Sequence, residues 1–279
     1  MADEADHNKD DDDPFVIPFD VPQLPRIRNA ISGGEANFSV DRRVVEDLAE
    51  ATPNGLEGLQ AVIEALNRFT LRAVRAVADE SEVRQVLHLG TGTASAAMVD
   101  EYVLGLVPDA RAVYVTDNTT ALAHAHVLWR DAPEGSVGHV QSRYDDPERI
   151  LRGAADTLDL DRPVAVVLPT TLNLLSDEGA GRLVDALGAR LAPGSHLIVA
   201  HTSLDIPAQG TAEVMELLNS VLDQPYVSRS EAEITRFFDG FDLLPPGVVP
   251  VEHWRCDGDP PFLPDGQLIP LFGAVGRKP

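Results

Sequence analysis

The sequence predicts an α/β protein with a doubly wound, mostly parallel seven-stranded sheet and an N-terminal helical extension. Short apolar runs alternate with amphipathic stretches after residue 80, which is typical of βαβ units. The apolar run Val86–Leu89 leads directly into a glycine-rich turn. The chain has 279 residues, of which 44% are hydrophobic, so it can bury one large core.

The sequence is predicted to divide into three successive segments. Residues 1–13 contain seven acids and one lysine, so we expect a solvated, disordered acidic tail. We expect residues 14–279 to form a single domain, in which 14–80 supply an arm and helices covering a pocket and 81–279 form the α/β core. Four prolines between Pro14 and Pro25 favour an extended arm. Its expected anchors are Phe15, Val16, Ile17 and Phe19, and Gly33-Gly34 is expected to be a turn.

Hydrophobic periodicity gives the order of the elements. Expected helices span about 40–51, 56–78, 94–106, 119–130, 147–156, 177–191, 210–222 and 230–239. Expected strands are Gln85–Leu89, Ala112–Thr116, Gly138–Gln141, Val164–Leu168, His196–Ala200, a segment near Phe241–Leu244, and Leu271–Val275. The last two would form an antiparallel hairpin.

Composition excludes several classes of protein. The net charge of -23 repels nucleic-acid backbones and anionic lipid, so we expect neither nucleic acid nor membrane as a partner. No stretch suggests a signal peptide or a membrane span. The single cysteine, Cys256, favours a reducing, cytoplasmic location. Lys9 and Lys278 are the only lysines, and neither lies in an apolar segment suited to a Schiff base.

The glycine-rich turn is the sharpest local signal. In Gly90-Thr91-Gly92, glycine lets the backbone approach a ligand, and the following helix would offer free N–H groups. Asp117-Asn118 follows the second expected strand, where a carboxylate can accept both ribose hydroxyls of a nucleotide or adenosine ligand. Asp117 could equally cap the next helix, because Asp and Asn are both favoured at helix N-termini.

Other chemistry-bearing patterns are weak. His124 and His126 point to different faces of a helix, so we expect no metal site. No nucleophile elbow or phosphate-binding P-loop occurs, and the catalytic residues are unknown from sequence. His201 could be a base at the ligand-binding edge, but a structural hydrogen-bonding role is favoured.

Several segments together resemble the actinobacterial S-adenosylmethionine methyltransferase-like proteins, long described as a domain of unknown function. The resemblance runs from about Pro25 to Pro279. It implies a class I methyltransferase-like Rossmann fold, S-adenosylmethionine as cofactor and a small-molecule substrate of specialised metabolism. The segments that carry it are 33–42, 89–92, 112–115, 121–125, 158–165, 191–195, 236–240 and 273–277.

The sequence departs from this family where the family usually carries cofactor-binding residues. Arg28-Asn29-Ala30 replaces Tyr-Asp-Tyr before Gly33-Gly34, and Thr116 replaces an acid, with Asp117 displaced by one position. His88 and Arg143 stand in place of acids, and Asn173 in place of a histidine. Each lost carboxylate removes charged hydrogen bonds, and each new cation would repel a sulfonium, so cofactor affinity is expected to be weakened.

Two functions follow from this resemblance. The first is S-adenosylmethionine-dependent methyl transfer, which depends mainly on proximity and orientation and needs no obvious base. The second is a repurposed methyltransferase fold with a degenerate cofactor site, acting as a cyclising or eliminating enzyme or as a noncatalytic partner subunit. The expected cofactor-binding residues are Gly33, Gly34, His88, Gly90, Thr91, Gly92, Asp117, Asn118, Arg143 and Asn173. A homo-oligomer or a partner protein is left open.

Overall fold

The structure is a computed structural model that describes residues 19–81, 83–90, 109–119, 121–122, 132–256 and 268–279. The acidic tail, the expected helix 94–106, most of the expected helix 119–130 and the residues Thr91, Gly92, His124 and His126 lie outside these ranges.

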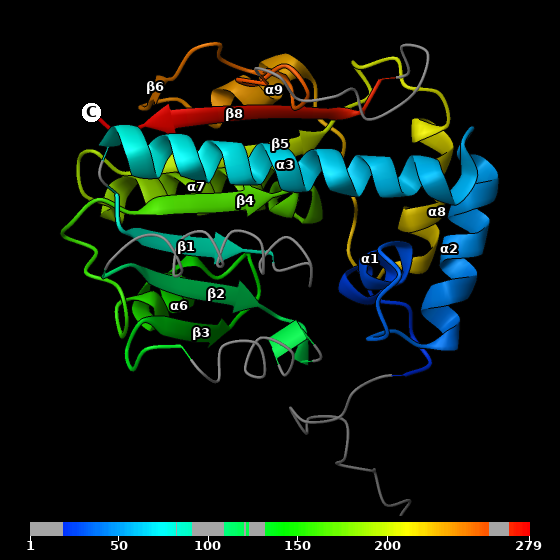
Figure 1. Cartoon of the computed structure of the whole chain (residues 1–279), viewed down its shortest axis with the longest axis horizontal. Coiled ribbons are helices and arrows are strands. Elements are labelled where there is room, and N and C mark those ends of the chain that lie inside the picture. Colours follow the sequence, from blue (N-terminus) through cyan, green and yellow to red (C-terminus); the bar gives the residue numbers. More distant parts are fainter. Residues whose placement is uncertain (1–18, 82, 91–108, 120, 123–131, 257–267) are drawn as a thin grey trace, which may run out of the picture.

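A twisted sheet forms the centre of the molecule (Figure 1). Its parallel part has the order β3-β2-β1-β4-β5, and β8 adds antiparallel to β5 with β6 beside it. The chain order reverses between β1 and β4, and ligands of open α/β sheets bind at such a point. The strands are β1 (Gln85–Leu89), β2 (Arg111–Thr116), β3 (Val137–Gln141), β4 (Ala165–Pro169), β5 (His196–Thr202), β6 (Asp242–Leu243), β7 (Val249–Pro250) and β8 (Leu271–Arg277).

The predicted doubly wound, mostly parallel sheet is confirmed. All seven expected strands are present, and the antiparallel pairing at the end of the chain is that of β6 with β8. The two-residue strand β7, which also pairs with β8, was not predicted. β7 contains Pro250, and because proline lacks the N–H needed for strand pairing, the sequence does not indicate a strand there.

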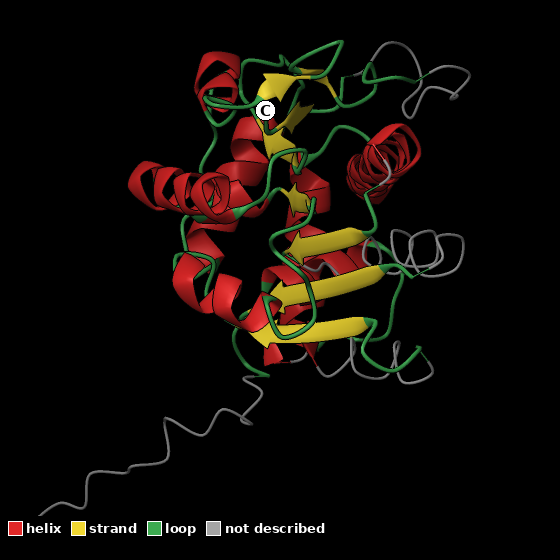
Figure 2. Ribbon diagram, turned by 90° about the vertical axis from the view of Figure 1, so that its left-hand side faces the viewer, coloured by secondary structure: helices red, strands yellow, loops and turns green. Residues whose placement is uncertain are grey.

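Helices cover both faces of the sheet, as Figure 2 shows. α3 (Gly55–Ser81) packs on one face, and α6 (Pro147–Ala154) and α7 (Asp177–Arg190) lie on the other. Alternate residues of β1 therefore enter different cores: Leu87 and Leu89 pack with α7, and Val86 packs with α3. Burial on both faces explains why the strands are continuous apolar runs rather than alternating ones.

A third layer of helices lies beyond the carboxyl ends of the parallel strands (Figure 1). It consists of α1 (Leu24–Ile31), α2 (Ser39–Ala51) and α8 (Thr211–Val221), which share an apolar core with the start of α3. We call these three helices the cap. The short α9 (Glu231–Arg236) is part of the expected helix 230–239, and the one-turn η2 (Thr171–Leu174) after β4 was not predicted.

The expected extended arm does not reach Pro25. Residues 14–18, which include the expected anchors Phe15, Val16 and Ile17, lie outside the described ranges. The chain enters α1 at Leu24, and Pro25 lies in the first turn, where its missing N–H is not needed. Gly33 follows the helix with a φ of 74°, so the expected glycine turn is confirmed. The expectation for Phe19 was also wrong, because its side chain is 70% exposed and anchors nothing.

A buried ion pair fixes α1 against α2. Arg26 Nε donates to Asp41 Oδ2 over 2.8 Å, and both side chains are almost completely buried. Asp41 also accepts from the backbone N–H groups of Gln23 and Phe38, which tie down the starts of both helices. This carboxylate therefore holds the starts of α1 and α2 together.

Candidate functional site

The glycine-rich turn begins at Gly90, immediately after β1. Gly90 has a φ of 90°, which L side chains rarely adopt, and a Cβ there would lie 2.5 Å from Thr171 Oγ1. The Thr171 hydroxyl is held in place by donating to the Leu89 carbonyl over 2.6 Å. Conformation and space thus both require glycine at this position.

A cavity of about 460 Å³ opens beside Gly90, and we call it the crevice cavity. Four of the predicted site residues line it: Gly90, Asp117, Asn118 and Arg143. They come from the carboxyl ends of β1, β2 and β3, which the parallel sheet brings to one edge. The other described lining residues are Pro22, Gln23, Leu24, Pro25, Arg28, Thr119, Tyr144, Leu174, Leu222, Asp223 and Gln224.

The sequence left two roles open at the end of β2, ribose binding and capping of the next helix, and Asn118 takes the capping role. Asn118 Oδ1 accepts from the Ala121 N–H over 2.8 Å, so Asn118 is the helix cap. Its Nδ2 donates to Gln23 Oε1, which joins the segment before α1 to the end of β2. Asp117 is thereby left to face the crevice cavity.

The carboxylate of Asp117 is partly removed from water. Burial raises its pKa above the usual value, and this effect outweighs the opposing influence of its own backbone N–H, Gln224 and Arg143. Its carboxylate accepts from the backbone N–H and from Gln224, and its remaining lone pairs can accept hydroxyl groups from a ligand. Thr116, which stands where the resembling family has an acid, is buried, and its hydroxyl accepts from the Asn118 N–H.

Arg143 does not bring an uncompensated cation to the cavity. Its guanidinium binds Asp145 through two hydrogen bonds of 3.0 Å each. The pair is solvent-accessible, with 63% of the Arg143 side chain exposed. The repulsion expected between Arg143 and a sulfonium is therefore reduced by Asp145 and by water.

His88 lies in the core rather than among the described residues that line the cavity. Its side chain is completely buried, and its ring meets the Tyr114 ring edge-on with 5.9 Å between the centroids. Burial lowers the pKa of His88 to about 4. The expectation of a cation at this position was wrong, since the imidazole is neutral at pH 7.

Asn173 and His201 belong to a buried network behind η2. Asn173 Nδ2 donates to the Val227 carbonyl over 2.7 Å. His201 Nε2 accepts from Arg229, since a guanidinium can only donate, and His201 Nδ1 therefore donates to the Thr202 carbonyl. Arg229 also donates to two carbonyls at the ends of η2. The favoured structural role of His201 is confirmed, and Asn173 orders the same turn.

Gly33 and Gly34 form the turn after α1 and are not among the residues that line the cavity. Asn29 packs against Gly34, where its side-chain nitrogen would lie 2.2 Å from a Cβ. The two glycines thus shape the connection between α1 and α2. Thr91 and Gly92 lie outside the described residues, as stated above.

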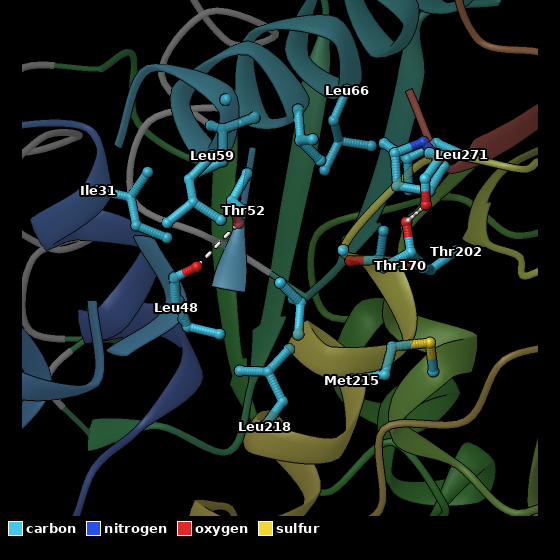
Figure 3. A pocket seen from close by; sticks show the side chains of 18 of the residues that line it. Ile31, Leu48, Thr52, Leu59, Leu66, Thr170, Thr202, Met215, Leu218 and Leu271 are labelled. Atoms are coloured by element: carbon cyan, nitrogen blue, oxygen red, sulfur yellow. Dashed lines mark hydrogen bonds between the residues drawn. The ribbon is translucent and has the colours of Figure 1, made fainter. Parts of the chain in front are cut away.

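A second cavity, of about 360 Å³, lies inside the cap, and we call it the apolar cavity (Figure 3). Leu48, Leu59, Met215 and Leu218 line it from the cap helices and α3, and Leu271 closes it from β8. Leu24 and Arg28 line both cavities, so α1 forms a wall between them.

The sequence did not predict the other residues that line the crevice cavity. Arg28 stands out in the sequence only as a departure from the resembling family, and Gln23, Tyr144, Asp223 and Gln224 carry no motif. Their place beside Gly90 depends on how the cap docks on the sheet, which a local pattern does not encode.

Within the described ranges, no three His, Cys, Asp or Glu side chains are grouped so that they could hold a metal ion. No helix within these ranges is long and apolar enough to cross a membrane.

Known proteins share this fold. A "putative methyltransferase" from Thermobifida fusca YX has a TM-score of 0.83 and 30% identity, over 92% of this chain and 95% of its own. A DUF574 family protein from Streptomyces avermitilis MA-4680 has a TM-score of 0.81 and 29% identity, over 94% and 99%. No curated protein matches the chain. The family model described as S-adenosyl methyltransferase matches residues 11–279, so the chain belongs to this family.

Proposed function

We propose that the protein is an S-adenosylmethionine-dependent methyltransferase that binds its cofactor in the crevice cavity and methylates a small molecule in the apolar cavity. One observation carries this assignment: Gly90 and Asp117, from the ends of adjacent strands, wall the same cavity at the point where the chain order of the sheet reverses. The single cysteine supports a cytoplasmic location.

The residues of the crevice cavity suit the cofactor. Gly90 lines the crevice cavity, so the methionine part can lie against its backbone. Asp117 offers the acceptor that two ribose hydroxyls need. Gln23, Asn118 and Gln224 add polar groups around it, so the ribose site does not depend on the family's usual acid at position 116.

The cofactor supplies an electrophilic methyl group on a sulfonium, and the protein orients the two reactants. Leu24 and Arg28 form the wall shared by both cavities and thereby mark where acceptor and methyl group would meet. Arg28 Nη2 donates to Thr170 Oγ1 over 2.5 Å, which fixes the guanidinium at this wall. Close, oriented approach of the reactants supplies most of the acceleration for such a displacement.

The alternative of a repurposed fold that has lost its cofactor is less well supported. It is motivated by the exchange of anionic side chains, but Asp117 lines the crevice cavity as a carboxylate that can accept ribose hydroxyls, and Asp145 balances Arg143. The family match also favours methyl transfer.

Calorimetric titration with S-adenosylmethionine and S-adenosylhomocysteine separates the two functions. We expect dissociation constants in the micromolar range for both nucleosides. Absence of binding at millimolar concentration would contradict the proposal and leave the repurposed fold as the better account.

A further inference from the structure

We infer that the methyl acceptor is an apolar weak acid, bound as its anion, whose hydrocarbon part fills the apolar cavity and whose negative group meets Arg28. This inference rests on the proposed function and adds the chemical class of the substrate. It follows from the walls of the cavity, from its charge, and from what the transfer requires.

The walls of the apolar cavity select a hydrocarbon. Leucine, isoleucine, valine and methionine side chains from four helices and β8 line much of it. Figure 3 labels Ile31, Leu48, Leu59, Leu66, Met215, Leu218 and Leu271 among them. Its volume of about 360 Å³ lies in the range of small-molecule sites. Ordinary cores are packed without voids of this size, so the space is suited to a ligand.

Most hydroxyl groups of the lining are already engaged by the protein. Thr52 donates to the Leu48 carbonyl and Thr211 to the Ala208 carbonyl, both over 2.8 Å. The Thr202 hydroxyl is hydrogen-bonded to the Tyr226 hydroxyl at 2.9 Å. These hydroxyl groups therefore need no hydrogen-bonding partner on a ligand inside the cavity.

Arg28 differs from them in charge. Among the described residues that line the apolar cavity it is the one charged side chain, and within the described chain it forms no ion pair with a carboxylate. Its hydrogen bond to Thr170 uses one of the five N–H donors of the guanidinium. A guanidinium beside an apolar space favours an anion through charge-assisted hydrogen bonds and disfavours a cation.

The chemistry of transfer agrees with an anionic acceptor. The oxygen anion of a carboxylate or phenolate attacks the methyl carbon, a new C–O bond forms, and the C–S bond breaks with its electron pair moving to sulfur. The products are a neutral methyl ester or ether and the neutral thioether. No proton has to be removed, which suits a cavity whose described lining contains no Asp, Glu or His.

Matched ten-carbon probes test this inference. Decanoate, decanol and decylamine share one hydrocarbon chain and differ in the charge of the end group. Isothermal titration of the full-length protein at pH 7.5 should show decanoate binding about tenfold or more tightly than decylamine, with decanol between them. Equal affinities, or tighter binding of decylamine, would overturn the inference.

Two variants test whether Arg28 is the group that binds the carboxylate of decanoate. Arg28→Met keeps the apolar stem and should reduce decanoate affinity to that of decanol, whereas Arg43→Met, at an exposed position of α2, should leave it unchanged. Retained preference for decanoate in Arg28→Met would overturn the inference. So would a variant that loses only its affinity for S-adenosylhomocysteine, since Arg28 would then serve the cofactor.

The probes also separate this inference from the proposed function. Decanoate is titrated without nucleoside, so its binding does not depend on whether the protein uses S-adenosylmethionine. Failure of both nucleosides to bind would contradict the proposed function alone. Failure of the charge order among the probes would contradict the assigned substrate class alone.

Discussion

Replacing Asp117 by asparagine tests the ribose assignment directly. The substitution keeps the size of the side chain and one oxygen acceptor but removes the negative charge. A hydrogen bond to a charged group contributes about 1.5–3 kcal/mol, so loss of one such bond weakens binding of S-adenosylhomocysteine by about 10- to 150-fold. Asp161→Asn, whose side chain is 85% exposed, is the matched control and should bind as the unaltered protein does.

The pH dependence of binding provides an independent check. Burial raises the pKa of Asp117, so its carboxylate becomes protonated at a higher pH than an ordinary aspartate. Affinity for S-adenosylhomocysteine should therefore fall as the pH is lowered through that raised pKa, and in Asp117→Asn this component of the fall should be absent.

The stability of Asp117→Asn shows whether weaker binding comes from a lost ligand contact or from unfolding of the protein. Removing a partly desolvated charge relieves a cost of folding, so Asp117→Asn should unfold in urea at the same or a higher midpoint. Calorimetric affinities within twofold of the unaltered protein, together with an unchanged pH profile, would refute the ribose assignment.

The remaining predictions concern the turn, the cap and the core. Gly90→Ala should lower the free energy of unfolding by about 1–3 kcal/mol, since the backbone is left-handed there and the new Cβ meets a threonine hydroxyl; an unchanged urea midpoint would contradict this. Asp41→Ala should cost about 3–5 kcal/mol by leaving a buried arginine unpaired, while Asp47→Ala, at an exposed position of the same helix, should cost less than about 0.5 kcal/mol in the same urea titration. His88, with a pKa of about 4, is neutral when folded and protonated when unfolded below about pH 6.5, so stability should fall by about 1.4 kcal/mol per pH unit between pH 6.5 and 4 on its account. His88→Leu should reduce that slope, and an unchanged slope would show that the histidine is not buried in its neutral form.

The strands could be predicted because their signal is local. A parallel sheet buried on both faces needs continuous apolar runs, and each run stands out between polar loops. The helix α1 could not be read in the same way. Prolines on both sides of Gln23 suggest an extended chain, yet Pro25 is compatible with a first helical turn, and tertiary packing of Leu24, Ile27 and Ile31 decides the outcome.

The sequence could predict only those site residues that lie just after the end of a strand. Gly90, Asp117, Asn118 and Arg143 each follow a strand of the sheet, so the topology brings them together. Which of two adjacent side chains caps the helix and which faces the cavity depends on backbone direction at the end of β2, and the sequence is silent on this. The contribution of Arg28 depends on docking of the cap, a contact between segments 142 residues apart at Thr170.

Because one helix, α1, walls both cavities, the cofactor and acceptor proposed above would be thermodynamically linked through it. If both bind better when α1 is well seated, each raises the affinity for the other, and by the same factor. The buried pair of Arg26 and Asp41 holds this helix at its start, so it sets how much seating remains for either ligand to contribute. Cooperativity between nucleoside and acceptor would thus be a property of the docking of eight residues rather than of direct contact between the ligands.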